Sequence, residues 1–203
     1  MTSPRALRDS LPLFWLLLAV PGAVMLTGWW SGATDTMDML HPTGEWSARM
    51  MIAAMLLGPL AGVIGPRGWL RWLLARRRAL GVAAFGYAVL HLIFYVIDMG
   101  SVAAMLDELP IKSIWTGWAA LALMLPMALT SNAAAMRALK RGWKQVQRLA
   151  YPAAVLTLLH WLWVHDGATA ALVHFAPLAL IWLCLAVRRI FLPPSLSQTG
   201  AKL

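Results

Sequence analysis

The chain has 203 residues, of which 61% are hydrophobic and 12% are charged. A soluble domain is roughly half apolar and about a quarter charged, so a water-soluble globular fold is excluded because it could not bury this much apolar surface. The net charge of +9 does not indicate a nucleic-acid partner, because the basic residues are confined to alternate connections between apolar segments.

Six long apolar segments follow one another along the chain, and most reach the ~17 residues that a helix needs to cross a ~30 Å hydrocarbon core. The segments are apolar on every face, whereas the strands of a membrane barrel alternate apolar with polar residues. We predict an all-α polytopic protein with one transmembrane domain, residues 1–203. Its six spans are expected at about 11–30, 48–66, 79–98, 114–132, 148–165 and 168–188.

The first segment, Leu11 to Trp30, follows Arg5 and Arg8 and so resembles a signal peptide. Its apolar run is longer than the core of a signal peptide. We therefore interpret it as the first membrane span.

Charge is segregated between the connections. All Lys and Arg residues except Arg49 and Lys112 lie before the first span, between the second and third, between the fourth and fifth, or after the sixth. All acidic residues except Asp9 lie on the other connections. By the positive-inside rule, the basic side is cytoplasmic, so both termini are expected in the cytoplasm.

Two histidines are expected inside spans, His91 in the third and His160 in the fifth. An ionisable group within a membrane is costly and is a functional candidate. Both helices run outward, so the two imidazoles should lie at comparable depth in the outer half of the membrane. Equal depth on two helices is what a haem held from both faces requires, in the core of the bundle. The alternative is that each histidine forms a structural hydrogen bond between helices.

The residues one and two turns before each histidine lie on the same helix face and would neighbour a bound haem. Tyr87 and Ala84 precede His91 on its helix face, and Thr157 and Ala153 precede His160. We expect the small residues Ala84 and Ala153 to leave room for a flat macrocycle.

The remaining histidines, His41, His165 and His174, lie near the outer ends of spans, where water and headgroups can satisfy them. His41 also begins a His-Pro-Thr-Gly stretch that we expect to form an ordered start of the second helix. The sequence contains no catalytic carboxylate pair, phosphate-binding loop, nucleophile triad or zinc-ligand spacing. The spans also lack the buried acids that are typical of a proton-coupled transporter.

The chain resembles the ferric-reductase-like transmembrane family from about His41 to Arg189, and within it the haem-binding membrane subunits of bacterial methionine sulfoxide reductase systems. The matching features keep their order along the chain: His41, Thr43 and Gly44; Arg77, Arg78, Leu80 and Gly81; Leu90 and His91; Leu129, Thr130 and Ser131; and Trp143, Tyr151, His160 and Trp163.

This resemblance implies an electron-transfer subunit of an oxidoreductase in the bacterial inner membrane. Such a subunit takes electrons from the quinone pool, or by another account from a flavin such as FMN, and passes them through b-type haem. The recipient is a periplasmic molybdopterin-containing methionine sulfoxide reductase subunit. His91 and His160 carry over as the axial ligands of the haem iron.

One departure from the family concerns the start of the fifth helix, where a histidine is often found and this chain has Gln147. With glutamine there and Arg78 at the corresponding place before His91, the chain lacks the histidines of a second bis-histidine haem, so one haem is expected. Further candidates for cofactor contacts are Arg77, Arg78, Tyr87 and Thr157. His41, Gln147 and His165 are candidates for a quinone or accessory site.

Arg77 and Arg78 have two interpretations, contacts with a flavin phosphate or anionic lipid and simple topology signals. Three rival functions also remain. They are a stand-alone transmembrane ferric or quinone reductase, a haem-free transporter, and a membrane anchor for a larger enzyme.

Overall fold

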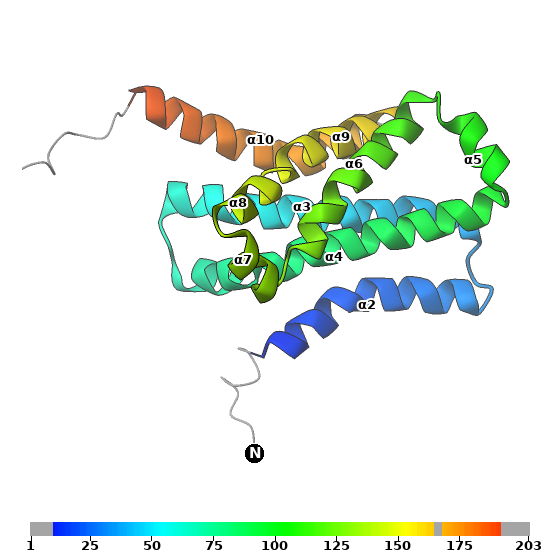
Figure 1. Cartoon of the computed structure of the whole chain (residues 1–203), viewed down its shortest axis with the longest axis horizontal. Coiled ribbons are helices and arrows are strands. Elements are labelled where there is room, and N and C mark those ends of the chain that lie inside the picture. Colours follow the sequence, from blue (N-terminus) through cyan, green and yellow to red (C-terminus); the bar gives the residue numbers. More distant parts are fainter. Residues whose placement is uncertain (1–9, 165–167, 192–203) are drawn as a thin grey trace, which may run out of the picture.

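The computed structural model describes residues 10–164 and 168–191, and within these residues the chain is helical without β-strands. The long helices run side by side along the longest axis of the molecule (Figure 1). The helices are α2 (Leu11–Trp30), α3 (Thr36–Ile64), α4 (Gly68–Met99), α5 (Val102–Glu108), α6 (Lys112–Leu129), α7 (Ala133–Leu139), α8 (Arg141–Gln147), α9 (Ala150–Val164) and α10 (Ala168–Phe191).

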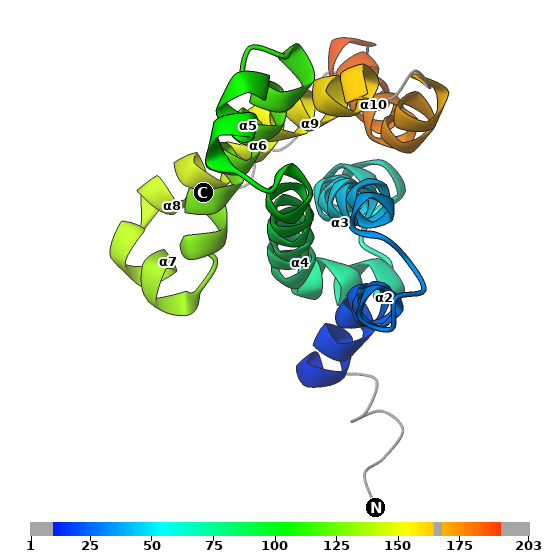
Figure 2. The ribbon, with the colours of Figure 1, turned by 90° about the vertical axis from the view of Figure 1, so that its right-hand side faces the viewer.

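The bundle has a central pair of helices, α3 and α4, with α2 on one side and α6, α9 and α10 on the other (Figure 2). Two clusters of buried apolar side chains hold these layers together. One joins α3 and α4 to α2, with Phe14 and Leu70 among its members. The other joins α3 and α4 to α6, α9 and α10, with Met124 and Phe175 among its members. The histidines of the sequence analysis belong to the second side of the bundle.

Four helices, α2, α3, α4 and α10, are long and apolar enough to cross a membrane. A fifth span is obtained if α5 and α6, which meet at 107°, are counted together. Helix α9 has 15 residues, fewer than the ~20 that cross a hydrocarbon core without tilt or thinning. The described residues thus contain four or five candidate spans, and the sixth stays a prediction.

Two helices extend well beyond the spans expected from hydropathy. Helix α3 begins twelve residues before the expected 48, and α4 begins eleven residues before the expected 79. At the start of α3, the Asp38 carboxylate accepts a hydrogen bond of 3.3 Å from the Asp35 backbone N–H, which stabilises a helix start in a polar segment. His41, Thr43 and Gly44 therefore lie in the first turns of the helix, as an ordered start of the second helix requires, although upstream of the span expected from residue 48.

The connection between the fourth and fifth spans contains the short helices α7 and α8. At its end, the Trp143 indole N–H donates to the Thr130 carbonyl oxygen at 3.0 Å. The Gln147 side-chain amide donates to the Met127 carbonyl oxygen at 3.1 Å. Both acceptors lie in the last turn of α6 or just beyond it, where carbonyls lack helical partners. This connection therefore caps α6.

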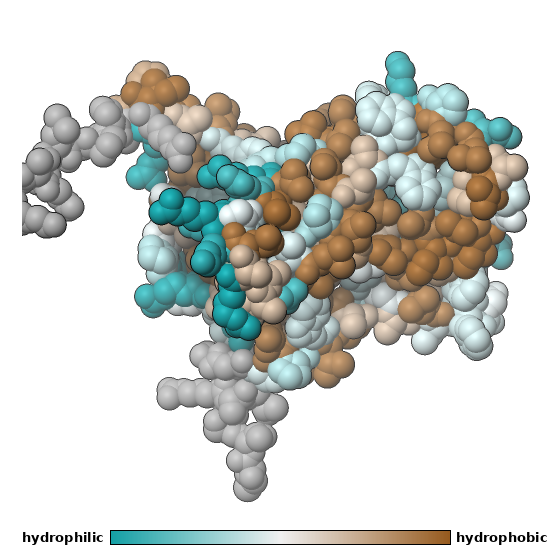
Figure 3. Space-filling view, in the orientation of Figure 1, coloured by the Kyte–Doolittle hydropathy of each residue, from teal (hydrophilic) through white to brown (hydrophobic). Residues whose placement is uncertain are grey.

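The surface of the bundle is apolar over much of its length, and hydrophilic residues gather at the end where α7 and α8 lie (Figure 3). Large hydrophobic side chains such as Leu16, Val24 and Leu180 are more than half exposed. An exposed apolar surface of this extent is typical of a protein that faces lipid.

Candidate functional site

A cavity of about 450 Å³ lies between the hairpin formed by α3 and α4 and the hairpin formed by α6 and α9. Most of its walls are aliphatic, aromatic or glycine, and the polar residues in them are few. The lining residues are Met37, Leu40, His41, Gly44, Glu45, Ser47, Ala48, Ala88, His91, Leu92, Tyr95, Ile114, Gly117, Trp118, Ala120, Leu121, Met124, Thr157, His160, Trp161 and Val164.

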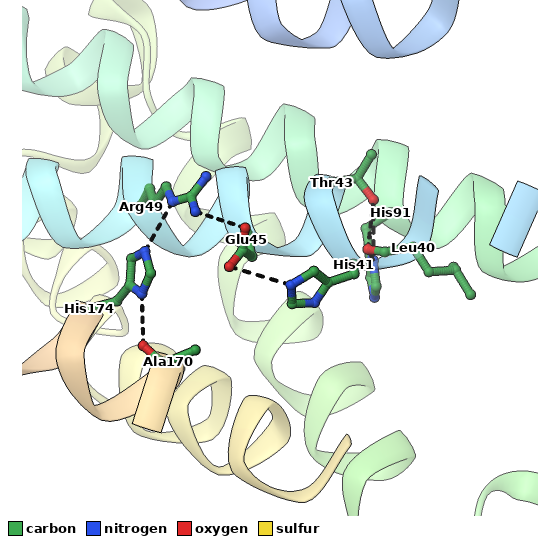
Figure 4. Close-up of polar contacts among 8 residues, drawn as sticks. All are labelled: Leu40, His41, Thr43, Glu45, Arg49, His91, Ala170 and His174. Carbon is green, nitrogen blue, oxygen red and sulfur yellow. Dashed lines mark hydrogen bonds and ion pairs between the residues drawn. The ribbon is translucent and has the colours of Figure 1, made fainter. Parts of the chain in front are cut away.

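His91 reaches the cavity from the C-terminal part of α4. Its Nδ1 lies 2.8 Å from the Leu40 carbonyl oxygen on α3 and 3.4 Å from the Thr43 hydroxyl (Figure 4). A carbonyl oxygen only accepts hydrogen bonds, so Nδ1 carries the proton. In that tautomer Nε2 carries the lone pair that binds a metal ion.

His160 reaches the same cavity from α9, and its ring is held in the same manner. Its Nδ1 lies 2.6 Å from the Ser113 carbonyl oxygen on α6. The same argument assigns the proton to Nδ1 and the metal-binding lone pair to Nε2. A hydrogen bond from the other ring nitrogen to a backbone carbonyl is the usual way in which a ligating histidine is oriented.

The two imidazoles lie next to each other across the cavity, with ring centroids 6.0 Å apart and ring planes at 82°. Two metal–nitrogen bonds of ~2 Å, with ~1 Å from each nitrogen to its ring centre, also add up to about 6 Å. The two rings thus lie close together, and their spacing fits that of two imidazoles bound to one metal ion.

The donor set fits haem better than an ion held by side chains alone. Among the residues that the structure describes, no group of three or more His, Cys, Asp or Glu could hold a metal. A metal bound by His91 and His160 therefore needs further ligands from a cofactor, as haem iron does from its macrocycle. The volume and apolar walls of the cavity suit such a flat apolar group.

The space in the cavity does not come from the residues expected to provide it. Ala84 and Ala153 are packed in the core cluster and do not line the cavity. The small lining residues include Ala48 on α3 and Ala120 on α6, on the helices opposite each histidine. The expectation for Ala84 and Ala153 is therefore wrong, because the room is made by alanines of the facing helices and by Ala88 on the helix of His91.

Ionisable side chains cluster beside the cavity, between α3 and α10 (Figure 4). Glu45 lies 3.5 Å from Nε2 of His41 and 2.8 Å from the Arg49 guanidinium. The Arg49 Nε–H donates to Nε2 of His174 at 3.2 Å. Within this group, His41 and Glu45 line the cavity and His174 does not. His41, which the sequence analysis named as a candidate for a quinone or accessory site, thus lines the cavity.

Of the two other candidates near the histidines, only Thr157 lines the cavity. Tyr87 is buried against α2. Its hydroxyl donates to the Leu18 carbonyl oxygen at 2.8 Å and accepts from the Gly22 N–H at 2.9 Å. The Tyr87 side chain therefore bridges a turn of α2 next to Pro21, where that helix bends (Figure 1). Its contacts are those of helix packing.

The inner candidates lie outside the cavity. The Arg77 Nε–H donates to the Ala54 carbonyl oxygen at 2.7 Å, and Arg78 contacts the Met136 sulfur at 3.6 Å. Gln147 caps α6, as described above. His165 lies outside the described residues. The structure thus places Arg77 against the middle of α3, Arg78 against α7 and Gln147 at the end of α6, and none of the three lines the cavity with the histidine pair.

Three contributors to the site were missed by the sequence analysis, namely Ser113, Gly117 and Glu45. Ser113 acts through its backbone carbonyl, which no side-chain pattern reveals. A Thr-Gly pair occurs in both halves of the site, at Thr43–Gly44 and Thr116–Gly117, but it also occurs at 27–28 and 199–200, so the pair alone does not mark the site.

Comparisons with known proteins identify relatives over most of the chain. The family described as "Ferric reductase like transmembrane component" matches residues 43–158, a range that includes His91 and ends two residues before His160. A protein of Xanthomonas oryzae pv. oryzae is 33% identical over 155 residues, covering 70% of this chain and 69% of the relative. It is called "Protein-methionine-sulfoxide reductase heme-binding subunit MsrQ".

Two further relatives have the same name. The protein of Azospira oryzae is 33% identical over 171 residues, covering 80% of this chain and 71% of the relative. The protein of Ralstonia nicotianae is 33% identical over 177 residues, covering 82% and 78%. No solved structure matches the chain.

Proposed function

Since this chain belongs to the ferric-reductase-like transmembrane family, we propose that it is a multi-pass membrane electron-transfer subunit that binds one b-type haem between His91 and His160. The observation that carries the proposal is the pair of imidazoles, 6.0 Å apart, in one apolar cavity. The names of the relatives support the cofactor, because each is called a haem-binding subunit.

When bound, haem supplies a one-electron carrier. The chain's own task is to present one neutral imidazole to each face, so that no coordination position stays open for oxygen or substrate. The Leu40 and Ser113 carbonyls hold the two rings in orientation, and the apolar cavity walls limit access of water. This arrangement favours electron transfer over ligand chemistry at the metal.

The proposed topology has six spans, both termini in the cytoplasm, and an inner-membrane location in a bacterium. The basic connections cluster at one end of the bundle, which the positive-inside rule assigns to the cytoplasm. The site lies toward the other end, because Leu40 and Ser113 belong to the first turns of α3 and α6. A site in the outer half suits a periplasmic electron acceptor.

The proposed acceptor is a periplasmic molybdopterin-containing methionine sulfoxide reductase subunit, and the relatives' names support this partner. The proposed donor is a quinone, with FMN as the second candidate. His41 and Glu45 at the cavity could accept protons from a quinol, with His165 and Gln147 as accessory candidates. Arg77 and Arg78 are the candidates for a flavin phosphate.

The proposal is tested by quantifying haem in the purified chain and in two variants, His91→Ala and His160→Ala. The control is His174→Ala, which removes a histidine of the same bundle that does not line the cavity. We expect the wild type and the control to show a Soret band and about one haem per chain. Each ligand variant should lose most of it, and retention of haem in both variants would contradict the ligation.

The rival functions give different outcomes in the same preparation. A wild-type chain without a Soret band would favour a haem-free transporter or anchor. A chain that reduces a chelated ferric salt from quinol as fast as it reduces the reductase partner would favour the stand-alone reductase. With the partner present in catalytic amount, we expect complete reoxidation of the reduced haem only when methionine sulfoxide is also present.

A further inference from the structure

The two helices that face the histidines, α3 and α6, share a local sequence pattern. Residues 40–44 of α3 read Leu-His-Pro-Thr-Gly, and residues 113–117 of α6 read Ser-Ile-Trp-Thr-Gly. In each, the first residue supplies the carbonyl that accepts from a histidine on the next long helix. Threonine and glycine follow three and four residues later, one helical turn away and on the same face.

The glycines lie directly against the histidine rings. A Cβ atom added to Gly44 would be 3.3 Å from Nδ1 of His91. A Cβ atom added to Gly117 would be 2.9 Å from both Nδ1 and Cε1 of His160. Each imidazole therefore approaches the backbone of the facing helix so closely that a methyl group would displace it, more severely at Gly117 than at Gly44.

The threonines act on the same two carbonyl groups. The Thr43 hydroxyl lies 2.6 Å from the Met39 carbonyl oxygen and 3.0 Å from the Leu40 carbonyl oxygen. The Thr116 hydroxyl lies 2.8 Å from the carbonyl oxygens of both Lys112 and Ser113, so each hydroxyl divides its one proton between two carbonyls. Their exposed fractions are 0% and 1%, which places them among the most buried side chains described. Each hydroxyl thus shares with Nδ1–H the carbonyl that orients the histidine.

We propose that Thr43, Gly44, Thr116 and Gly117 are positioning residues that fix the orientation of the two imidazoles and tune their strength as donors to the metal. This inference rests on the proposed haem ligation. The glycines let each ring reach its carbonyl and hold it in one rotational position. The threonines weaken the hydrogen bond from Nδ1–H by occupying part of the carbonyl's accepting capacity.

The role of the glycines is tested with Gly117→Ala and Gly44→Ala. The matched control is Gly86→Ala on α4, where an added Cβ meets nothing within 4 Å. Electron paramagnetic resonance of the oxidised protein reports the mutual orientation of the two axial rings. We expect shifted g-values and reduced haem content in Gly117→Ala, a smaller change in Gly44→Ala and none in Gly86→Ala. A wild-type spectrum from Gly117→Ala would overturn the glycine role.

The role of the threonines is tested with Thr116→Val and Thr43→Val, which keep the side-chain volume and so remain informative if the alanine variants do not fold. With the hydroxyl removed, Nδ1–H should bond its carbonyl more strongly, which makes the imidazole a stronger donor and stabilises the oxidised metal. We therefore expect a lower midpoint potential in both variants. Thr27→Val, in which the lost hydroxyl bonds only the Val24 carbonyl on α2, should leave the potential unchanged.

The results separate this inference from the proposed function. If His91→Ala and His160→Ala both retain haem, the ligation itself fails. If those variants lose haem while Gly117→Ala keeps wild-type g-values and Thr116→Val keeps the wild-type potential, only the positioning role fails.

Discussion

The half of the bundle proposed to face outward and the half proposed to face the cytoplasm, called here the outer and inner halves, both place polar side chains among apolar helices, yet they use them differently. In the outer half, His91 and His160 each donate one hydrogen bond to a backbone carbonyl and meet across a cavity. In the inner half, the polar groups of Arg77 and Gln147 donate to backbone carbonyls of α3 and α6, and neither residue lines that cavity. A histidine has a second nitrogen with a lone pair, so it can be oriented by the backbone and still bind a metal.

The strongest test of this contrast changes a ligand without removing it, by His91→Met. We expect haem to be retained in part and its midpoint potential to rise by on the order of 100 mV or more, because methionine ligation favours the reduced metal. A spectroelectrochemical titration measures the shift. An unchanged potential with full haem content would show that His91 is not an axial ligand.

The inner half is tested by Gln147→Leu, which removes the hydrogen bonds to the Met127 carbonyl and the Thr130 hydroxyl. We expect the free energy of unfolding in detergent to fall by about 2 kcal/mol, with haem content and potential unchanged. Gln145→Leu, at an exposed position of the same helix, should have little effect. Loss of haem in Gln147→Leu would contradict the interpretation that polar side chains of the inner half serve only helix packing.

A third test concerns Tyr87, which the sequence placed among the cofactor contacts and the structure places against α2. Tyr87→Phe removes the hydroxyl that joins the Leu18 carbonyl and the Gly22 N–H. We expect a loss of about 1 kcal/mol in stability and an unchanged haem spectrum. The exposed Tyr151 supplies the control, Tyr151→Phe. A Soret band that shifts in Tyr87→Phe and not in Tyr151→Phe would indicate that Tyr87 contacts the haem.

The smallest effects are expected from the charges at the edge of the cavity. Glu45→Gln should raise the midpoint potential by on the order of tens of millivolts, because a nearby carboxylate stabilises the oxidised state. Arg49→Gln should lower it, because Arg49 neutralises Glu45. Redox titrations of both variants at equal ionic strength measure the two shifts. Shifts of the same sign would contradict an electrostatic origin.

The fold was predictable where apolar runs coincide with helices. The expected first and sixth spans correspond closely to α2 and α10. The expected starts of the second and third spans fall inside α3 and α4, because charged residues mark where a helix leaves the hydrocarbon and not where it ends. Helix ends depend on capping, as Asp35 and Asp38 show at the start of α3.

The site was predictable for its two histidines, since an imidazole within an apolar span is costly and rare. Their neighbours were less predictable. Residues three and four before a ligand lie about 100° apart around a helix, and the sequence does not say which faces the cavity. The structure places Ala88 and Thr157, each three residues back, in the cavity wall, and turns Tyr87, four residues back, toward α2.

The sequence by itself determined the helical membrane class, the segregation of charge and the two imidazoles at comparable depth, because each depends on residue type and spacing along one chain. Only the tertiary structure decided which carbonyls orient those rings and which glycines admit them. It also decided which polar groups cap helices instead of facing the cavity. These features depend on how one helix is rotated against another, and that rotation is set by packing between residues far apart in the chain.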